Sequence, residues 1–163
     1  MLNLPKIYLA SPLGFSESGR FFMYEKLIPS IEYSGYSVIN PWDVAPKNLI
    51  EKANLMDKGI ERTIFLNNLN SLIGDRNIDA IDSCLGIFAV LDGVDVDSGV
   101  ASEIGYGYAI GKTIMGYRND FRNAGDNEAS KINLQVERFI ELSNGKIVCN
   151  LENIKEELDI VFK

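Results

Sequence analysis

The stretch Ser83–Lys112, SCLGIFAVLDGVDVDSGVASEIGYGYAIGK, joins an apolar segment to an acidic loop and a helix rich in small residues. Within it, Leu85–Leu91 is too short for most helices and ends at Asp92 and Gly93. This run is therefore predicted to be a strand buried on both faces of a sheet. A helix over Gly99–Ile110 is expected to follow the loop.

The start of that helix carries two carboxylates. Asp97 or Ser98 can cap the free backbone N–H groups, and Gly99 leaves room for a ligand to approach the backbone. The helix dipole is expected to favour an ionised Glu103, whereas Asp97 is expected to share the site in its protonated form. Two carboxylates whose pKa values are separated can act as a nucleophile and an acid.

Strands and helices alternate along the rest of the chain. This order predicts an α/β fold of the flavodoxin-like type, a doubly wound five-stranded parallel sheet in the order 2-1-3-4-5 with helices on both faces. A single domain over residues 1–163 is expected. The further strands are expected at Lys6–Ala10, Tyr36–Asn40, Thr113–Tyr117 and Lys146–Cys149, and the further helices at Gly19–Ser34, Ile132–Leu142 and Leu151–Phe162.

Two helical regions contain residues that favour interruptions. Pro29 should kink or break the helix over Gly19–Ser34. The region Val44–Ile81 suggests one or two helices, with a break at Gly74.

In such folds ligands bind beyond the carboxyl ends of the strands. The segments predicted to border one cleft there are Ser11–Phe15, Pro41–Asp43, Asp92–Gly99 and Arg118–Asp126. The last lies within Arg118–Lys131, a long polar segment predicted to be a lid or a binding loop.

The charge balance argues for a small neutral ligand. With 16 basic and 23 acidic residues, the formal net charge is −7, which disfavours binding to a nucleic-acid polymer or to an anionic membrane surface. No leader or membrane-spanning segment is recognised, and a cytoplasmic location is expected. Cys84 and Cys149 are both expected to be buried free thiols.

The chain contains no histidine, which excludes a Ser-His-Asp triad and a histidine-based zinc site. Acid–base chemistry must rest on Asp, Glu, Tyr, Lys or Cys, and no metal or organic cofactor is expected. A Rossmann-type dinucleotide binder is the alternative for this architecture, but no G-x-G-x-x-G follows the first strand.

The segment Asp97–Tyr106, DSGVASEIGY, resembles the D-x-G-x-x-x-E-[IL]-G-[YC] signature of nucleoside 2-deoxyribosyltransferases, whose Glu is the nucleophile that attacks the sugar. Ile7–Pro12 resembles the opening strand and loop of that family, whose Tyr lies close to the catalytic Glu. The resemblance implies catalytic roles for Glu103, Asp97 and Tyr8.

The resemblance extends to the family's purine-and-pyrimidine type. Asp120–Arg122 and Asp126–Asn127 resemble its D-F-R…D-N loop, and Asn133–Glu137 resembles its N-L-x-V-E segment. The Asn of that segment contacts the sugar in a neighbouring subunit's site, and here either Asn133 or Asn144 can take that position.

Further substrate contacts follow from the same resemblance. Phe15 or Trp42 is expected to stack on the base. Asn77 stands where some members carry a second base-contacting Asp, and an Asn can hydrogen-bond a base but cannot protonate it. The expected substrate-binding residues are Ser11, Phe15, Trp42, Asn77, Gly99, Ser102, Asp126 and Asn133.

The resemblance implies a nucleoside 2′-deoxyribosyltransferase that exchanges free purine and pyrimidine bases through a covalent deoxyribosyl-Glu103 intermediate. It also implies a homo-oligomer, usually a hexamer built of dimers. One alternative is a 2′-deoxynucleoside 5′-monophosphate N-glycosidase, for which Ser16, Ser18 and Arg20 are candidate phosphate ligands. The other is a nucleotide-sensing module without catalytic activity.

Overall fold

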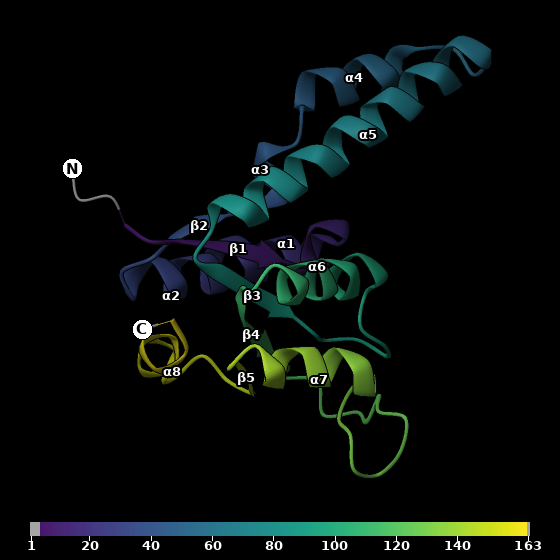
Figure 1. Ribbon diagram of the computed structural model, residues 1–163. Helices are drawn as coiled ribbons and strands as arrows, with labels where there is room; N and C mark the ends of the chain where they lie inside the picture. Colours follow the sequence, from purple (N-terminus) through teal and green to yellow (C-terminus); the bar gives the residue numbers. More distant parts are fainter. Residues whose placement is uncertain (1–3, 163) are drawn as a thin grey trace.

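A five-stranded, all-parallel sheet in the order β2-β1-β3-β4-β5 organises the molecule (Figure 1). The computed structural model describes residues 4–162. The strands are β1 (Lys6–Ala10), β2 (Ser37–Ile39), β3 (Gly86–Val90), β4 (Thr113–Tyr117) and β5 (Lys146–Val148). The predicted fold class and strand order are confirmed.

The central strand β3 is buried along its whole length. Ile87 and Ala89 pack into the core on one side of the sheet, and Phe88 and Val90 pack into the core on the other. Because both faces are covered, an apolar residue is favoured at every position, and this is why the strand reads as an uninterrupted apolar run.

Helices cover both faces of the sheet (Figure 1). The end of α5, together with α6 and α7, packs on one face, whereas the helical segment from α1 to α2 and α8 pack on the other. The helices are η1 (Leu13–Phe15), α1 (Glu17–Phe22), η2 (Met23–Leu27), α2 (Ile28–Tyr33), α3 (Pro41–Val44), α4 (Lys47–Leu55), α5 (Ile60–Ser83), α6 (Ser98–Ala109), α7 (Leu134–Leu142) and α8 (Ile154–Phe162).

The helix predicted over Gly19–Ser34 changes its hydrogen-bond pattern shortly before Pro29. The chain from α1 to α2 stays helical, but the segment η2, directly before α2, is a π-helix. Pro29 lies in the first turn of α2, where its missing N–H removes one bond of the helical ladder. The wider π-turn accommodates this loss without ending the helix.

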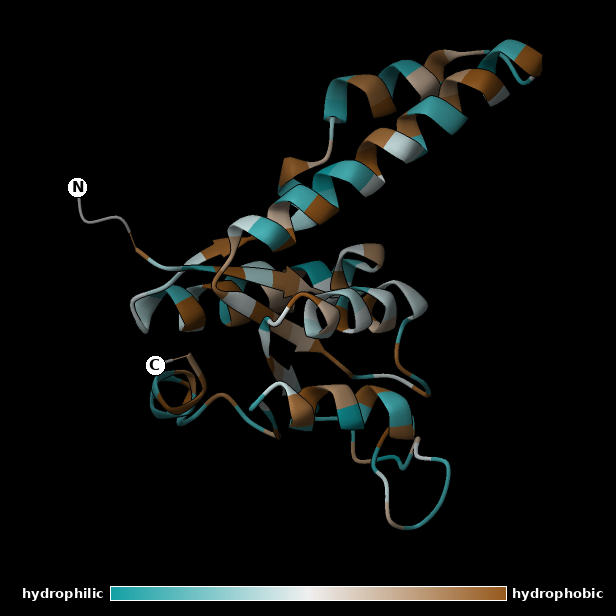
Figure 2. Cartoon of the chain, viewed as in Figure 1, coloured by the Kyte–Doolittle hydropathy of each residue, from teal (hydrophilic) through white to brown (hydrophobic). Residues whose placement is uncertain are grey.

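The helices α4 and α5 form a hairpin that projects away from the sheet (Figure 1). Hydrophobic and hydrophilic residues alternate along both helices to the tip (Figure 2), where Leu55, Ile60 and Ile64 are exposed. Even so, among residues 4–162 no helix is both long enough and apolar enough to cross a membrane.

The break predicted at Gly74 is wrong, because α5 runs without interruption from Ile60 to Ser83. A Cβ added at Gly74 would meet no atom within 4 Å, so the residue lies on the open side of the helix. One glycine lowers helix stability by only about 1 kcal/mol, which the residues on either side of it offset.

The two cysteines differ in their surroundings. Cys84 is a buried free thiol, as predicted, whereas Cys149 is free but exposed, which corrects the prediction. The difference arises because β5 is an edge strand that ends at Val148, so the next side chain lies outside the core.

We expect Gly74→Ala to raise the free energy of unfolding by about 0.5 to 1 kcal/mol, measured by urea denaturation. Alanine loses less backbone entropy than glycine in a helix, and the added methyl group meets open space. As a contrast, Gly145→Ala should destabilise the fold, because its Cβ would lie 1.7 Å from the carbonyl oxygen of Ile114. A destabilised Gly74→Ala variant would indicate that residue 74 needs a glycine after all.

Candidate active site

The site lies between two neighbouring strands, β1 and β3, whose following connections run to opposite sides of the sheet. β1 and β3 are adjacent and parallel, yet β1 connects to β2 on one side and β3 to β4 on the other. Such a switch point leaves a crevice beyond the strand ends. Here it holds a cavity of about 310 Å³, which is within the range of small-molecule sites.

The chemical end of this cavity joins the loop after β1 to the first turns of α6. Its lining residues there are Ser11, Asp97, Gly99, Val100 and Glu103. The hydroxyl of Tyr8, a fully buried residue of β1, donates a hydrogen bond of 2.6 Å to Oε1 of Glu103. Strand and helix thus hold the carboxylate at a fixed position.

Burial is the main influence on the ionisation of this pair. Loss of solvent raises the pKa of Glu103, the hydrogen bond from Tyr8 lowers it, and the negative charge of Asp97 raises it, so that the net pKa is about 7. Burial and the neighbouring Glu103 also raise the pKa of Tyr8 well above its usual value. Desolvation therefore opposes the ionised form of Glu103 that was expected from the helix dipole.

Asp97 is the N-cap of α6. Its Oδ1 accepts hydrogen bonds from the backbone N–H groups of Gly99, at 2.9 Å, and Val100, at 3.1 Å. These bonds fix the carboxyl group beside Glu103 and leave Oδ2 for other contacts. The hydroxyl of Ser102 instead donates to the carbonyl oxygen of Ser98, and Ser102 does not line the cavity.

An aromatic wall forms one side of the cavity. Trp42 donates from Nε1 to the carbonyl oxygen of Ser11 at 3.1 Å, and its backbone N–H binds Oδ1 of Asn40. Phe15 meets the Trp42 ring edge to face, with 4.7 Å between ring centroids. Gly14 is required beneath this ring, because a Cβ there would lie 2.1 Å from the indole. Both aromatic residues were predicted at the site, whereas the close approach of Gly14 to the indole and the role of the buried Asn40 were not.

A further part of the cavity lining comes from the α4–α5 hairpin and the turn before it. Ala45, Ile50, Ile73 and Asn77 line the cavity there. Asn77 was expected at the site, but the three apolar residues were missed. A signal did exist, since Ile73 and Asn77 are four residues apart and share one face of a helix.

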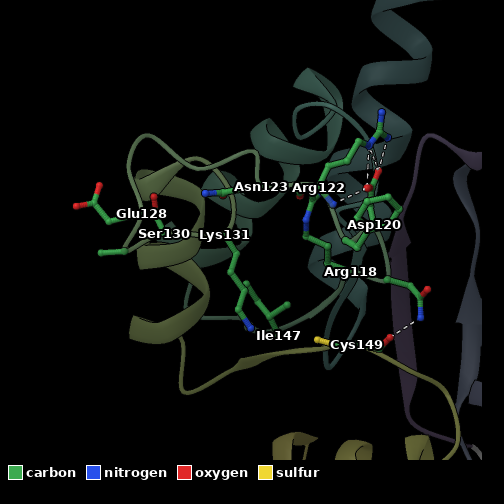
Figure 3. Close-up of a pocket in the computed structure, with 12 residues that line it drawn as sticks. Arg118, Asp120, Arg122, Asn123, Glu128, Ser130, Lys131, Ile147 and Cys149 are labelled. Atoms are coloured by element: carbon green, nitrogen blue, oxygen red, sulfur yellow. Dashed lines mark hydrogen bonds and ion pairs between the residues drawn. The ribbon is translucent and has the colours of Figure 1, made fainter.

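The loop after β4 does not border this cavity, contrary to the prediction. It encloses a second cavity of about 550 Å³, lined in part by Arg118, Lys131, Ile147 and Cys149 (Figure 3). β4 lies on the other side of β3 from β1, so the end of β4 is displaced from the switch point.

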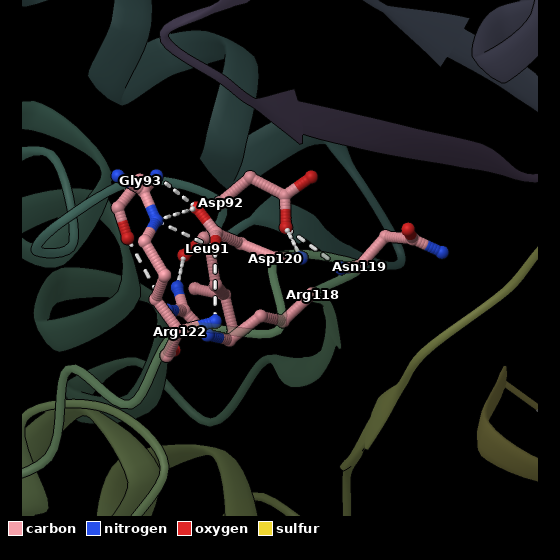
Figure 4. A network of polar contacts seen from close by, with 7 residues as sticks. All are labelled: Leu91, Asp92, Gly93, Arg118, Asn119, Asp120 and Arg122. Atoms are coloured by element: carbon pink, nitrogen blue, oxygen red, sulfur yellow. Dashed lines mark hydrogen bonds and ion pairs between the residues drawn. The ribbon is translucent and has the colours of Figure 1, made fainter.

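A polar network ties this loop to the one after β3 (Figure 4). The buried guanidinium group of Arg118 donates to the carbonyl oxygens of Leu91, Gly93 and Arg122. Oδ1 of Asp92 accepts from the backbone N–H groups of Asn119, at 2.7 Å, and Asp120, at 2.8 Å. These bonds hold the loop against its neighbour instead of over the first cavity.

The remaining predicted residues lie apart from the first cavity. Oδ2 of Asp126 accepts from the backbone N–H of Leu134 at 2.7 Å, and Asn133 is the N-cap of α7. Asn144 follows α7 with a φ of 61°, in the left-handed region. Within the described residues 4–162, no group of three or more His, Cys, Asp or Glu side chains is arranged to hold a metal ion.

The sequence profile of the nucleoside 2-deoxyribosyltransferase family matches residues 7–144. The chain belongs to this family. Membership places the protein among the enzymes of the deoxyribosyltransferase and N-glycosidase group. A search of curated protein sequences found no match.

Solved structures with this family's fold resemble the chain over most of its length. A conserved protein from Enterococcus faecalis V583 is 27% identical, with a TM-score of 0.65, covering 96% of this chain and 98% of that one. A 2-deoxyribosyltransferase from Bacillus psychrosaccharolyticus is 20% identical, with a TM-score of 0.65 and coverages of 92% and 90%. A CMP N-glycosidase from Clostridium botulinum is 19% identical, with a TM-score of 0.57 and coverages of 94% and 98%.

We expect Glu103→Gln to stabilise the protein by about 3 kcal/mol at pH 8 and to leave its stability unchanged at pH 4. Between the ordinary pKa of 4.5 and the folded pKa of about 7, the folded protein binds more protons than the unfolded chain. Stability therefore falls as the pH rises through this window, and the neutral variant escapes that loss.

Urea denaturation at the two pH values measures this difference. The matched control is Glu32→Gln, which replaces an exposed carboxylate of α2 and should have the same effect at both pH values. An equal effect of Glu103→Gln at pH 4 and pH 8 would contradict the raised pKa.

Proposed function

We propose that this protein is a nucleoside 2′-deoxyribosyltransferase that works by two displacements at C1′ of the sugar. The observation that carries the proposal is the buried hydrogen bond between Tyr8 and Glu103 at the wall of a nucleoside-sized cavity. It leaves Oε2 of Glu103 available for attack and holds the carboxylate in one orientation.

In the first displacement, Glu103 bonds to C1′ as the bond from C1′ to the base nitrogen breaks. Asp97 donates the proton that the departing base takes up. In the second, a nitrogen of the incoming base attacks C1′ and gives its proton to Asp97, and the ester bond to Glu103 breaks. The hydrogen bonds from Gly99 and Val100 to Oδ1 of Asp97 support this role, because they leave Oδ2 to exchange the proton.

The charges around the cavity favour a nucleoside over a nucleoside monophosphate. Among the described residues 4–162, its lining includes two carboxylates, Asp97 and Glu103, and no Lys or Arg, so a phosphate group would meet like charges. Two of the three candidate phosphate ligands, Ser16 and Arg20, have hydrogen-bond partners within the protein. Oγ of Ser16 accepts from the N–H of Gly19, and Arg20 donates to the carbonyl oxygen of Gly14. The N-glycosidase alternative therefore has less support.

The position of Asn133 agrees with a shared site in a homo-oligomer. It lies at the start of α7, outside the cavity of its own chain. A neighbouring copy that contributed this residue would also help to keep water away from the ester, which transfer to a base requires.

We expect incubation of the protein with 2′-deoxyuridine and adenine to yield 2′-deoxyadenosine. Chromatography of the reaction products measures this yield. Glu103→Ala should lower the rate by roughly a thousandfold or more, because the nucleophile is lost. Glu32→Ala, which removes an exposed carboxylate of α2, should keep the wild-type rate.

Parallel reactions separate the alternatives. Release of uracil from dUMP alone, without transfer from 2′-deoxyuridine, would support the monophosphate N-glycosidase. Thermal stabilisation by nucleosides with no product in any reaction would support a binding module.

We expect base release by the wild-type enzyme to rise with pH around 7, since Glu103 must be ionised to attack and its pKa is about 7. In Tyr8→Phe the hydrogen bond that lowers this pKa is lost, so the rise should move to higher pH. The pH profile of kcat/KM measures this shift. Tyr36→Phe, a change at a buried tyrosine on the opposite face of the sheet, should leave the profile in place. An unmoved profile in Tyr8→Phe would mean that Tyr8 does not influence Glu103.

A further inference from the structure

One part of the cavity lining, outside the loop after β1 and the first turns of α6, has a distinct composition. We name Ala45, Ile50, Ile73 and Asn77 the hairpin wall, after the α4–α5 hairpin that contributes most of it. The wall offers three apolar side chains and one amide, and none of its side chains is charged. The transfer reaction itself needs none of these groups, so the wall is available to recognise the substrate.

The proposed reaction determines which part of the base meets this wall. In the proposed reaction, Asp97 and Glu103 place the bond between C1′ and the base at the first turns of α6. The rings of Phe15 and Trp42 can stack on the face of the base. The edge of the base remote from the sugar is then left to the hairpin wall.

The groups of the wall define the base edge that fits it. The amide of Asn77 has both a donor and an acceptor, so it pairs with an N–H and a carbonyl that lie next to each other. Ile73 is four residues earlier on α5 and so lies beside that amide on the same face of the helix. An apolar substituent adjacent to the hydrogen-bonding groups of the base would be buried against Ile73 and Ile50.

We propose that the hairpin wall makes the enzyme prefer bases with an apolar substituent beside an N–H and carbonyl pair, as in 5-methylpyrimidines, and that Ile73 sets this preference. The inference rests on the proposed transferase function. Burying one methyl group against an apolar wall favours thymidine over 2′-deoxyuridine by about three- to tenfold.

The test compares thymidine and 2′-deoxyuridine as donors to adenine. Their kcat/KM ratio in one protein sample does not depend on the folded fraction, so a partly destabilised variant still reports it. We expect a ratio of about three to ten for the wild type, expressed mainly in KM, and a ratio close to one for Ile73→Ala. Ile64→Ala makes the same change in α5 outside the cavity and should keep the wild-type ratio.

Calorimetric titration of both nucleosides into Glu103→Gln measures the same preference without turnover. Equal affinities, or an affinity ratio that Ile73→Ala leaves unchanged in the Glu103→Gln background, would overturn the role of the wall. If the affinities differ as expected but the wild type consumes neither nucleoside, the proposed transferase function is wrong, whereas the role of the hairpin wall in base preference is retained.

Discussion

The hydrogen bond between Tyr8 and Glu103 joins residues that are 95 positions apart in the chain. It can form only if β1 and β3 are adjacent and parallel and if α6 returns over the end of the sheet. Tyr8 is fully buried, so its hydroxyl group cannot exchange Glu103 for water if the hydrogen bond breaks. The sheet order, the cap of α6 and the switch point are all needed to bring these two oxygen atoms together.

Burial gives this contact its chemical value. A carboxylate in an apolar setting is destabilised relative to any uncharged form of the same group. The protonated acid is one such form, and its relative stability raises the pKa of Glu103. The ester of the proposed intermediate is another, so the surroundings that disfavour the charge also favour bond formation. The hydrogen bond from Tyr8 opposes this trend enough to keep part of Glu103 ionised near neutral pH.

Most of the fold and the chemical end of the site followed from the sequence, for identifiable reasons. The doubly covered strand β3 and the capped start of α6 are local patterns, and the resemblance linked Tyr8 to Glu103. The sequence could not reveal that desolvation would raise the pKa of Glu103, because burial depends on the packing of distant segments. The predictions for Gly74 and for the loop after β4 were wrong because each depends on contacts outside its own segment. A glycine is tolerated when its helix is stable on both sides, and the loop is held by Arg118 through carbonyl groups that have no sequence signature.

The uninterrupted course of α5 has a mechanical consequence. Its 24 residues form a rod about 36 Å long, and Ile73 and Asn77 lie on that rod and not on a flexible loop. Their backbone positions cannot adjust separately, so the spacing between the apolar contact and the amide stays constant. A larger base can be admitted only by rotating side chains or by tilting the hairpin as one body.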